Sequence, residues 1–287
     1  MPNGLNLLSI TGRPHSTAQE KPCHQHTSIK SLFSTDHLPP PLRFRPISQD
    51  RRLVVVSNRL PVTFKKDGRT ELSSGGLVTA LVSVLNKRGG LWIGWSGTPG
   101  NMKKKLDRFV QDQAYGLHPV TLAPEDVDGF YSGFANQVLW PLFQGFPAKC
   151  VFKPDFWDAY DRVNHTFALE VANHTSESDY IWIHDYHPIN VASKLKQTGE
   201  VRECGFYLHI PFPPPDLFLK LPWRQALLAG LLEYELVGFQ TEWDRDNFLH
   251  TVRTMVPEAR ITPSGTSFTI RKGRNTTGIR MHAADMA

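Results

Sequence analysis

From residue 52 onward, hydrophobic positions follow two alternating patterns. Short, mostly apolar runs are typical of buried strands, and they occupy residues 53–57, 91–95, 114–122, 180–184, 204–210 and 235–241. Between most of these runs, apolar residues recur at helical spacing, at 77–85, 155–174, 189–196, 223–232 and 242–255. Apolar strands that alternate with helices predict a parallel sheet covered on both faces. We therefore expect an α/β fold with a Rossmann-like doubly wound parallel sheet.

The same patterning divides the chain into three segments. Residues 1–51 are rich in Ser, Thr, Pro, His and Gln and follow neither period, so we interpret them as a disordered or mis-assigned leader. Residues 52–270 form the predicted domain. The sequence RKGRNTTGIRMHAADMA at 271–287 looks like neither a strand leading onward nor a capped ending, and we interpret it as an aberrant tail.

Composition narrows the class of protein. The net charge is +5, but the basic excess lies near the two ends, because residues 53–270 hold 21 basic and 23 acidic side chains. A nucleic-acid-binding surface on the folded part is therefore not predicted. Three unpatterned cysteines exclude a disulfide framework and favour a reducing, cytoplasmic location. No run approaches the roughly 18 apolar residues of a membrane helix, so no membrane partner is expected.

Polar or aromatic residues stand where the predicted strands end. They are Arg59, Trp95–Ser96, His184–Asp185, His209 and Gln240–Thr241. In doubly wound sheets, ligands bind just beyond the carboxyl ends of the strands. These positions therefore predict a common pocket along one edge of the sheet.

Two of the candidate groups suit an anion, although each also has a structural interpretation. Arg59 is either an exposed arginine in a turn or a guanidinium that binds an anion through two parallel hydrogen bonds, with Pro61 stiffening the exit from the strand. Gly75 and Gly76 precede a predicted helix and would let a phosphate approach backbone N–H groups. Alternatively, SSGGL is a flexible loop in which Ser74 caps the helix.

The histidines are less specific. His209 is either a buried, hydrogen-bonded side chain or a ligand contact. HDYH at 184–187 does not predict a metal site, because adjacent side chains rarely converge on one ion and no third ligand follows at a defined spacing. Its carboxylate suits hydrogen bonding to sugar hydroxyls better. The sequence has no P-loop, zinc-type cysteine spacing or Ser–His–acid order, so kinases, zinc fingers and hydrolases are without support.

Over roughly residues 52–260 the chain resembles the trehalose-6-phosphate synthases. Eight motifs occur in the order seen in that family, namely VVVSNRLP, SSGGL, GLWIGWSG, VLWPLF, YIWIHDYHP, FYLHIPFPPPDLF, LPWR and LVGFQTEWDRDNFL. The resemblance implies the amino-terminal half of a glucosyltransferase with two Rossmann domains, the GT-B architecture. Such enzymes move glucose from UDP-glucose to glucose 6-phosphate with retention of configuration, forming trehalose 6-phosphate. They need no cofactor and no catalytic metal.

The resemblance also implies roles on the acceptor side. Arg59 looks like the arginine that holds the acceptor phosphate, and Asp185 like the carboxylate that hydrogen-bonds the acceptor sugar. Tyr131 and Trp140 would line the same subsite, and Trp95 resembles another acceptor-side aromatic residue. For Tyr131 and Trp140 the alternative is core packing, since large aromatic side chains bury well.

On the donor side, His209 looks like the histidine at the donor glucose, and Gly75 and Gly76 like the loop that approaches the UDP phosphates. His209 and Asp185 are thus the expected catalytic residues. Departure of UDP builds negative charge, which oriented N–H donors stabilise. Retention without a candidate carboxylate nucleophile favours a front-face displacement, as the family implies.

The chain also departs from the family, because the resemblance fades after about Arg260 and members continue into a second, nucleotide-binding domain. We therefore expect an incomplete fragment with weak activity or none. Its partners would be a sugar phosphate and a nucleotide sugar, with the oligomeric state left open. Two other functions remain: a regulatory, non-catalytic sugar-phosphate-binding homologue, and a related transferase that uses another phosphorylated acceptor such as glycerol 3-phosphate.

Overall fold

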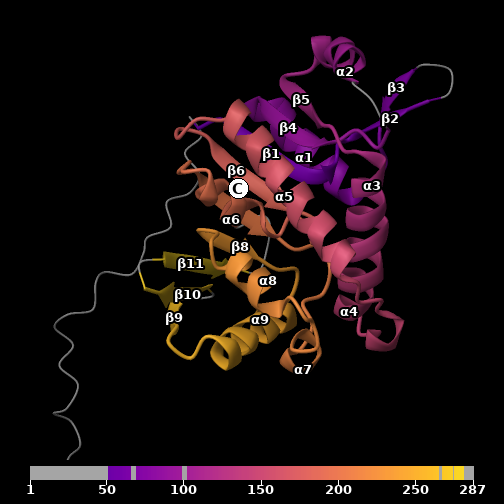
Figure 1. The fold of residues 1–287 in the computed structure, drawn as a ribbon. Helices are drawn as coiled ribbons and strands as arrows, with labels where there is room; N and C mark the ends of the chain where they lie inside the picture. The colour runs from indigo at the N-terminus through magenta and orange to yellow at the C-terminus, as the bar shows by residue number, and fades with distance from the viewer. Residues whose placement is uncertain (1–50, 66–68, 99–101, 265–266, 274, 281–287) are drawn as a thin grey trace, which may run out of the picture. The chain divides into compact units, whose positions relative to one another are not determined.

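The computed structural model describes residues 51–65, 69–98, 102–264, 267–273 and 275–280. In these residues the centre of the fold is a nine-stranded sheet (Figure 1). Across the sheet the strands follow the order β5 (Tyr115–Val120), β4 (Gly90–Trp95), β1 (Leu53–Arg59), β6 (Tyr180–His184), β7 (Glu203–Tyr207), β8 (Leu236–Gly238), β11 (Asn275–Arg280), β10 (Ser267–Lys272) and β9 (Arg260–Ser264).

Strand pairing confirms that the sheet is doubly wound. β1 pairs in parallel with β4 on one side and with β6 on the other. The chain runs outward from β1 through β4 to β5, returns to β6, and then winds in the opposite direction through β7 and β8. The topological switch point therefore lies between β1 and β6, and in such sheets this is where residues beyond the strand ends form a ligand crevice.

Two apolar cores flank the sheet, because side chains of a strand point alternately to its two faces. Val54 and Val56 of β1 pack into one core, whereas Leu53 and Val55 pack into the other. All four side chains are buried, so the strand is apolar throughout. The first core is covered by α5 (Pro154–His174), α6 (Val191–Gln197), α8 (Arg224–Leu231) and α9 (Glu242–Met255), and the second by α1 (Gly76–Arg88) and α2 (Lys103–Phe109).

A helical run that the hydrophobic pattern does not predict packs along α5. It consists of α3 (Pro124–Asp126), the π-helix η2 (Val127–Leu139) and α4 (Trp140–Phe143). Its glycines are poor helix formers, but they permit close approach to α5. A Cβ on Gly129 would lie 2.5 Å from the Ala159 Cβ, and one on Gly133 would lie 2.6 Å from the Phe156 ring. Helix packing therefore overrides the local propensity.

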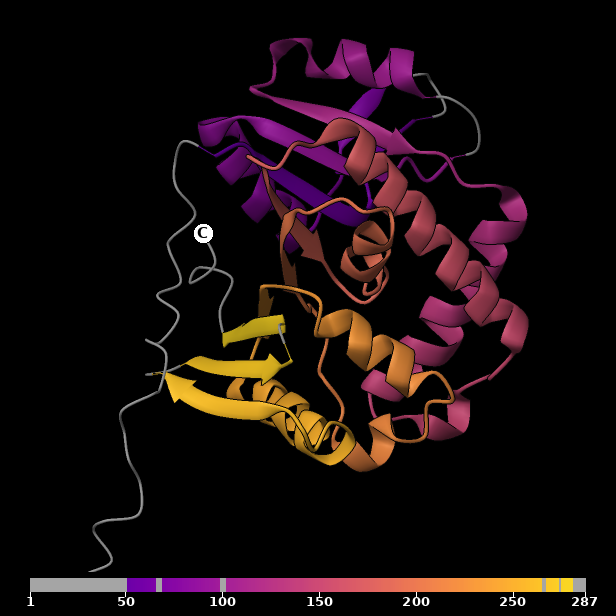
Figure 2. The same ribbon diagram turned by 60° about the vertical axis from the view of Figure 1, so that its left-hand side comes forward.

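The expectation that residues after 270 contain no strand is wrong. Arg271 and Lys272 end β10, and β11 pairs in parallel with β8. Thr277 and Ile279 are buried in this position, so β11 extends the sheet through tertiary contacts that the polar sequence NTTGIR barely signals. Figure 2 shows β9, β10 and β11 in yellow, lying side by side. The proposed leader lies almost entirely outside the described residues.

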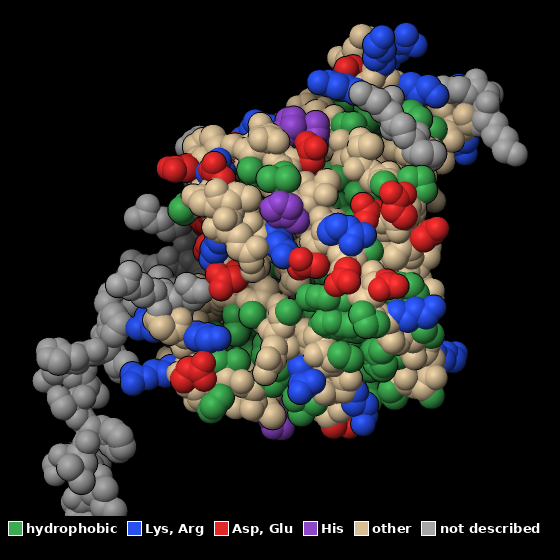
Figure 3. Space-filling model, in the orientation of Figure 1, with side chains coloured by type: hydrophobic (Ala, Val, Ile, Leu, Met, Phe, Trp, Pro, Cys, Tyr) green, Lys and Arg blue, Asp and Glu red, His purple; other side chains and the backbone are tan. Residues whose placement is uncertain are grey.

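The remaining elements are short. They are the hairpin of β2 (Val62–Phe64) and β3 (Thr70–Leu72), the helix α7 (Pro215–Phe218), and the 3₁₀ turns η1 (Val110–Asp112) and η3 (Pro147–Lys149). On the face shown in Figure 3, acidic and basic side chains are interspersed. Of the helices that the described residues form, none combines the length and apolarity needed to cross a bilayer.

Candidate functional site

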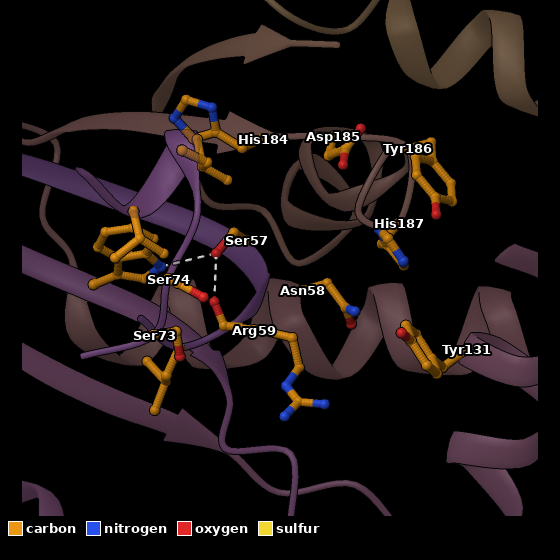
Figure 4. A pocket seen from close by; sticks show the side chains of 14 residues that line it. Ser57, Asn58, Arg59, Ser73, Ser74, Tyr131, His184, Asp185, Tyr186 and His187 are labelled. Carbon is orange, nitrogen blue, oxygen red and sulfur yellow. Dashed lines mark hydrogen bonds between the residues drawn. The ribbon is translucent and has the colours of Figure 1, made fainter. Parts of the chain in front are cut away.

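A cavity of about 420 Å³ opens at the switch point (Figure 4). It lies where β1 and β6 end, next to the start of α1 and the side of η2. The residues that line it are Ser57, Asn58, Arg59, Leu60, Ser73, Ser74, Leu77, Val78, Trp92, Tyr131, His184, Asp185, Tyr186 and His187. The predicted edge pocket is therefore present, and three of the predicted site residues, Arg59, Tyr131 and Asp185, line it.

Arg59 is the last residue of β1 and stands in a well-fixed piece of backbone. The Trp92 indole N–H donates to Ser57 Oγ at 2.8 Å, and Ser57 Oγ donates to the Arg59 carbonyl at 2.7 Å. The guanidinium itself lies over the Trp95 ring, with Cζ 4.8 Å from the ring centroid. Trp95 is thus a support for Arg59 and does not line the cavity. Arg59 is exposed and lines the cavity, and no carboxylate of the described residues forms an ion pair with it, so its charge has no internal counter-ion.

Asp185 follows β6 in a strained conformation, with φ at 74°, a value that side chains other than glycine rarely adopt. Burial raises the pKa of its carboxyl to about 6, although backbone N–H groups of Tyr186 and His209 oppose the shift. Its Oδ1 atom is buried and accepts no hydrogen bond from any described group. A buried acceptor without a donor is costly, so this oxygen is suited to a ligand hydroxyl.

His209 does not line the cavity, but it contacts His184, which does. Nδ1 of His184 and Nε2 of His209 are 3.0 Å apart, so one donates a hydrogen bond to the other. Burial lowers the pKa of His209 to about 4 and lowers the pKa of His184 well below its usual value. Both rings are therefore neutral at pH 7, and His209 acts here as a hydrogen-bonding group and not as a cation.

An aromatic wall closes the side of the cavity formed by η2. The rings of Tyr131 and His187 stack with centroids 5.7 Å apart and an interplanar angle of 15°. Trp140 lies 5.9 Å from the Tyr186 ring, but it is 44% exposed and does not line the cavity. Trp140 is therefore neither a lining residue of the cavity nor a buried core residue, as the alternative interpretation expected. The ring centroids of Tyr131 and Trp95 are 6.1 Å apart, so this wall adjoins the Trp95 ring over which Arg59 lies.

Gly75 and Gly76 form the start of α1, flanked by the cavity residues Ser74 and Leu77. A Cβ placed on either glycine would meet no atom within 4 Å, so this turn is open to a ligand. The first N–H groups of a helix lack internal partners and favour negative charge. Ser74 does not cap the helix, because the N-cap position is Gly75 and no side chain bonds there.

Not every predicted strand-end residue lies at the cavity. Thr241 accepts a hydrogen bond from the backbone N–H of Asp244 and caps α9, outside the cavity lining. Conversely, the interpretation of the sequence missed Asn58 and His187, whose side chains carry buried polar atoms without partners among the described groups. Both adjoin a predicted residue, in SNR and in HDYH, and that adjacency is the signal that could have identified them.

Comparisons with known proteins find similar sequences and similar structures. Residues 51–282 match the profile of Glycosyltransferase family 20. Trehalose-6-phosphate synthase of Mycobacterium sp. (strain KMS) is 39% identical over 237 residues, which cover 81% of this chain and 45% of the relative. The match to the family extends beyond the point near Arg260 where the resemblance was expected to fade.

Two solved structures are similar to the fold. The α,α-trehalose-phosphate synthase (UDP-forming) from Burkholderia xenovorans, in complex with glucose-6-phosphate, has a TM-score of 0.69 at 29% identity, covering 80% of this chain and 49% of that one. A structure described as trehalose-6-phosphate from E. coli bound with UDP-2-fluoro glucose has a TM-score of 0.67 at 36% identity, covering 80% and 48%. This chain spans about half the length of the proteins it matches.

Proposed function

Because the chain belongs to glycosyltransferase family 20, we propose that its cavity binds glucose 6-phosphate as the acceptor of a glucosyl group from UDP-glucose. The product of that transfer is trehalose 6-phosphate. The observation that carries the proposal is Arg59, which lines the cavity and has no carboxylate partner among the described residues.

Charge and geometry at Arg59 support a phosphate ligand. A guanidinium presents a planar fork of N–H donors that matches two phosphate oxygens. The Trp95 ring packs against the guanidinium, with its centroid 4.8 Å from Cζ, so Arg59 loses less side-chain freedom when the anion binds. A sugar with a single negative charge should bind at Arg59 more weakly than a phosphate ester, because a charge-assisted hydrogen bond strengthens as the charge of its acceptor increases.

Polar atoms elsewhere in the cavity support a sugar attached to that phosphate. Asp185 Oδ1 and Asn58 Oδ1 are buried acceptors without donors among the described groups. Hydroxyls of a hexose would supply donors to both. The stacked rings of Tyr131 and His187 offer an apolar surface for the C–H face of a sugar ring.

The donor would approach from the side of α1 and His209. Gly75 and Gly76 leave the first turn of α1 open, where N–H groups stabilise the charge that develops on the departing pyrophosphate. His209 is neutral and held by His184, so it would orient the donor sugar through a hydrogen bond. Asp185, ionised at pH 7, would hold an acceptor hydroxyl in the orientation for transfer.

Calorimetric titration of the chain with glucose 6-phosphate tests the proposal. We expect saturable binding that is at least about tenfold weaker for Arg59→Ala, because a charge-assisted hydrogen bond contributes about 1.5–3 kcal/mol. Arg162→Ala is the matched control, since Arg162 is exposed and pairs with Asp126 outside the cavity. Equal affinity of wild type and Arg59→Ala would overturn the assignment.

Two further measurements distinguish the alternatives. Release of UDP from UDP-glucose, measured with and without glucose 6-phosphate, separates a transferase from a regulatory protein that only binds the sugar phosphate. A parallel titration with glycerol 3-phosphate tests the acceptor. Arg59 would bind either phosphate, whereas the hydroxyl acceptors Asn58 and Asp185 favour the hexose.

A further inference from the structure

A second cluster of ligand-type side chains lies away from the cavity, at the edge of the sheet. His118 belongs to the edge strand β5, and Glu170 and His174 occupy the last turns of α5, four residues apart. Residues at this spacing lie on one face of a helix. None of the three lines the cavity, and the reaction proposed above does not use them.

The three side chains are close enough to share one ion. One potential ligand atom from each lies within 4.8 Å of the other two. His118 Nε2 is 2.8 Å from Glu170 Oε2, and the two imidazole centroids are 3.6 Å apart. Two ligands of a tetrahedral zinc ion, each about 2.1 Å from it, are separated by about 3.4 Å. His118 Nε2 and Glu170 Oε2 are therefore close to the spacing of two ligands of one ion, and the adjacent His174 ring can supply the third.

A hydrogen bond within the cluster favours its metal-binding form. His174 Nδ1 donates to the Glu170 carbonyl at 2.8 Å, which fixes the tautomer and leaves the Nε2 lone pair available, as in many metal sites.

From this geometry we propose that His118, Glu170 and His174 form a binding site for a transition-metal dication, with zinc as the expected ion. Two imidazoles and one carboxylate are a ligand set that suits zinc, whereas magnesium and calcium prefer oxygen ligands. The side chains of the three residues are 17%, 30% and 35% exposed, so solvent can supply the remaining ligand. The ion would fasten the edge strand β5 to α5 and is separate from the sugar site.

Titration of the full chain with zinc chloride, followed by calorimetry, tests the proposal. Because histidines and a cysteine also occur before residue 51, the comparison must be between variants. We expect one equivalent of zinc to be lost, or bound at least about tenfold more weakly, in His118→Gln and in His174→Gln. His165→Gln, which removes an exposed histidine from the same helix outside the cluster, should retain it.

Thermal unfolding provides the second readout. Excess zinc should raise the Tm of the wild type and of His165→Gln by several degrees, since an ion that binds only the folded state stabilises it. The rise should be absent in His118→Gln and His174→Gln, whose unfolding without metal shows whether each variant folds. Glu170→Gln gives an independent measurement if either variant is unfolded. Unchanged zinc stoichiometry and an unchanged Tm shift in the variants would overturn the proposal.

Discussion

The guanidinium of Arg59 lies over the Trp95 ring, with Cζ 4.8 Å from the ring centroid, although the two residues end different strands. β1 and β4 are parallel neighbours, so their carboxyl ends meet at the same edge. The backbone also joins them, because Leu60 N–H donates to the Trp95 carbonyl at 2.9 Å. The phosphate-binding candidate is therefore positioned by the adjacent strand.

Gly97 leaves room for this arrangement, and its substitution is the first prediction. Gly97 has φ at 80°, and a Cβ there would overlap the Arg59 guanidinium. Since that guanidinium is the end of a flexible side chain, Gly97→Ala should displace it and weaken glucose 6-phosphate binding by about tenfold, comparable with losing one charge-assisted bond. Calorimetric titration measures the change.

Gly145→Ala is the matched control for this substitution. Gly145 has φ at 81°, but a Cβ there meets nothing within 4 Å. Both variants carry a similar backbone strain of about 1 kcal/mol in the free energy of unfolding. Only Gly97→Ala should lose affinity, and equal affinity of the two variants would show that the position of Arg59 over Trp95 does not matter for binding.

The sheet and the strand-end residues were predictable because their signals are local. The run Leu53–Val56 is apolar since both faces of β1 are buried, and parallel strands bring residues after their carboxyl ends to one edge. Arg59 and Asp185 could therefore be assigned to one pocket from positions 126 residues apart. The placement of Gly75 and Gly76 before a helix was likewise visible in the sequence.

Other features depend on contacts that no local pattern carries. In the sequence, Gly97 looks like an ordinary turn glycine. Only the fold shows that the Arg59 side chain fills the space that a Cβ on Gly97 would occupy. The strand β11 was missed because its polar residues become a strand through pairing with β8. His187 was not singled out, because its stacking on Tyr131 depends on how η2 packs against the sheet.

The second prediction concerns the ionisation of Asp185. Its pKa is raised to about 6 by burial, so the carboxyl gains a proton as the pH falls from 7 to 5. A hydrogen bond to a charged acceptor is stronger than one to a neutral acceptor, and binding of glucose 6-phosphate should weaken by up to about tenfold over that interval. The ligand phosphate also titrates near pH 6, so the wild type alone does not isolate the effect.

Asp185→Asn separates the two titrations. Asparagine tolerates a positive φ and preserves the shape of the side chain, but it does not ionise in this range. The variant should bind more weakly at pH 7, and its disadvantage relative to the wild type should shrink as the pH falls to 5. Parallel pH profiles for the two proteins would mean that the Asp185 carboxylate does not contact the ligand.

The third prediction tests the close packing of η2 on α5. A Cβ on Gly129 would lie 2.5 Å from the Ala159 Cβ, and neither atom can rotate away. Gly129→Ala gains about 1 kcal/mol of helix propensity, but overpacking costs about 1–3 kcal/mol, so we expect net destabilisation in urea unfolding. Adding Ala159→Gly should recover part of the loss. A double variant less stable than the sum of the two single changes would contradict this contact.

The last prediction is that acid destabilises the fold through the histidines at the cavity. Burial lowers the pKa of His187 to about 3 and that of His209 to about 4, and it also lowers that of His184. Between those values and the unfolded pKa of about 6.5, the unfolded chain binds more protons, so stability falls as the pH falls. At pH 5, His187 and His209 should each have lowered the free energy of unfolding by about 2 kcal/mol relative to pH 7.5.

Asp185 acts in the opposite direction. Its folded pKa of about 6 lies above the unfolded value, so protonation favours the folded state as the pH falls through 6. This contribution is about 1.4 kcal/mol at pH 5, smaller than that of the histidines together, and the net effect remains acid destabilisation.

A substitution at His187 isolates one of these contributions. His187→Phe keeps an aromatic ring beside Tyr131 and removes the titrating group. In urea unfolding, the stability lost between pH 7.5 and pH 5 should be about 2 kcal/mol smaller for this variant than for the wild type. His165→Phe, on the exposed face of α5, should lose as much as the wild type. If His187→Phe loses as much stability in acid as His165→Phe, then His187 is not held neutral by burial in the folded protein.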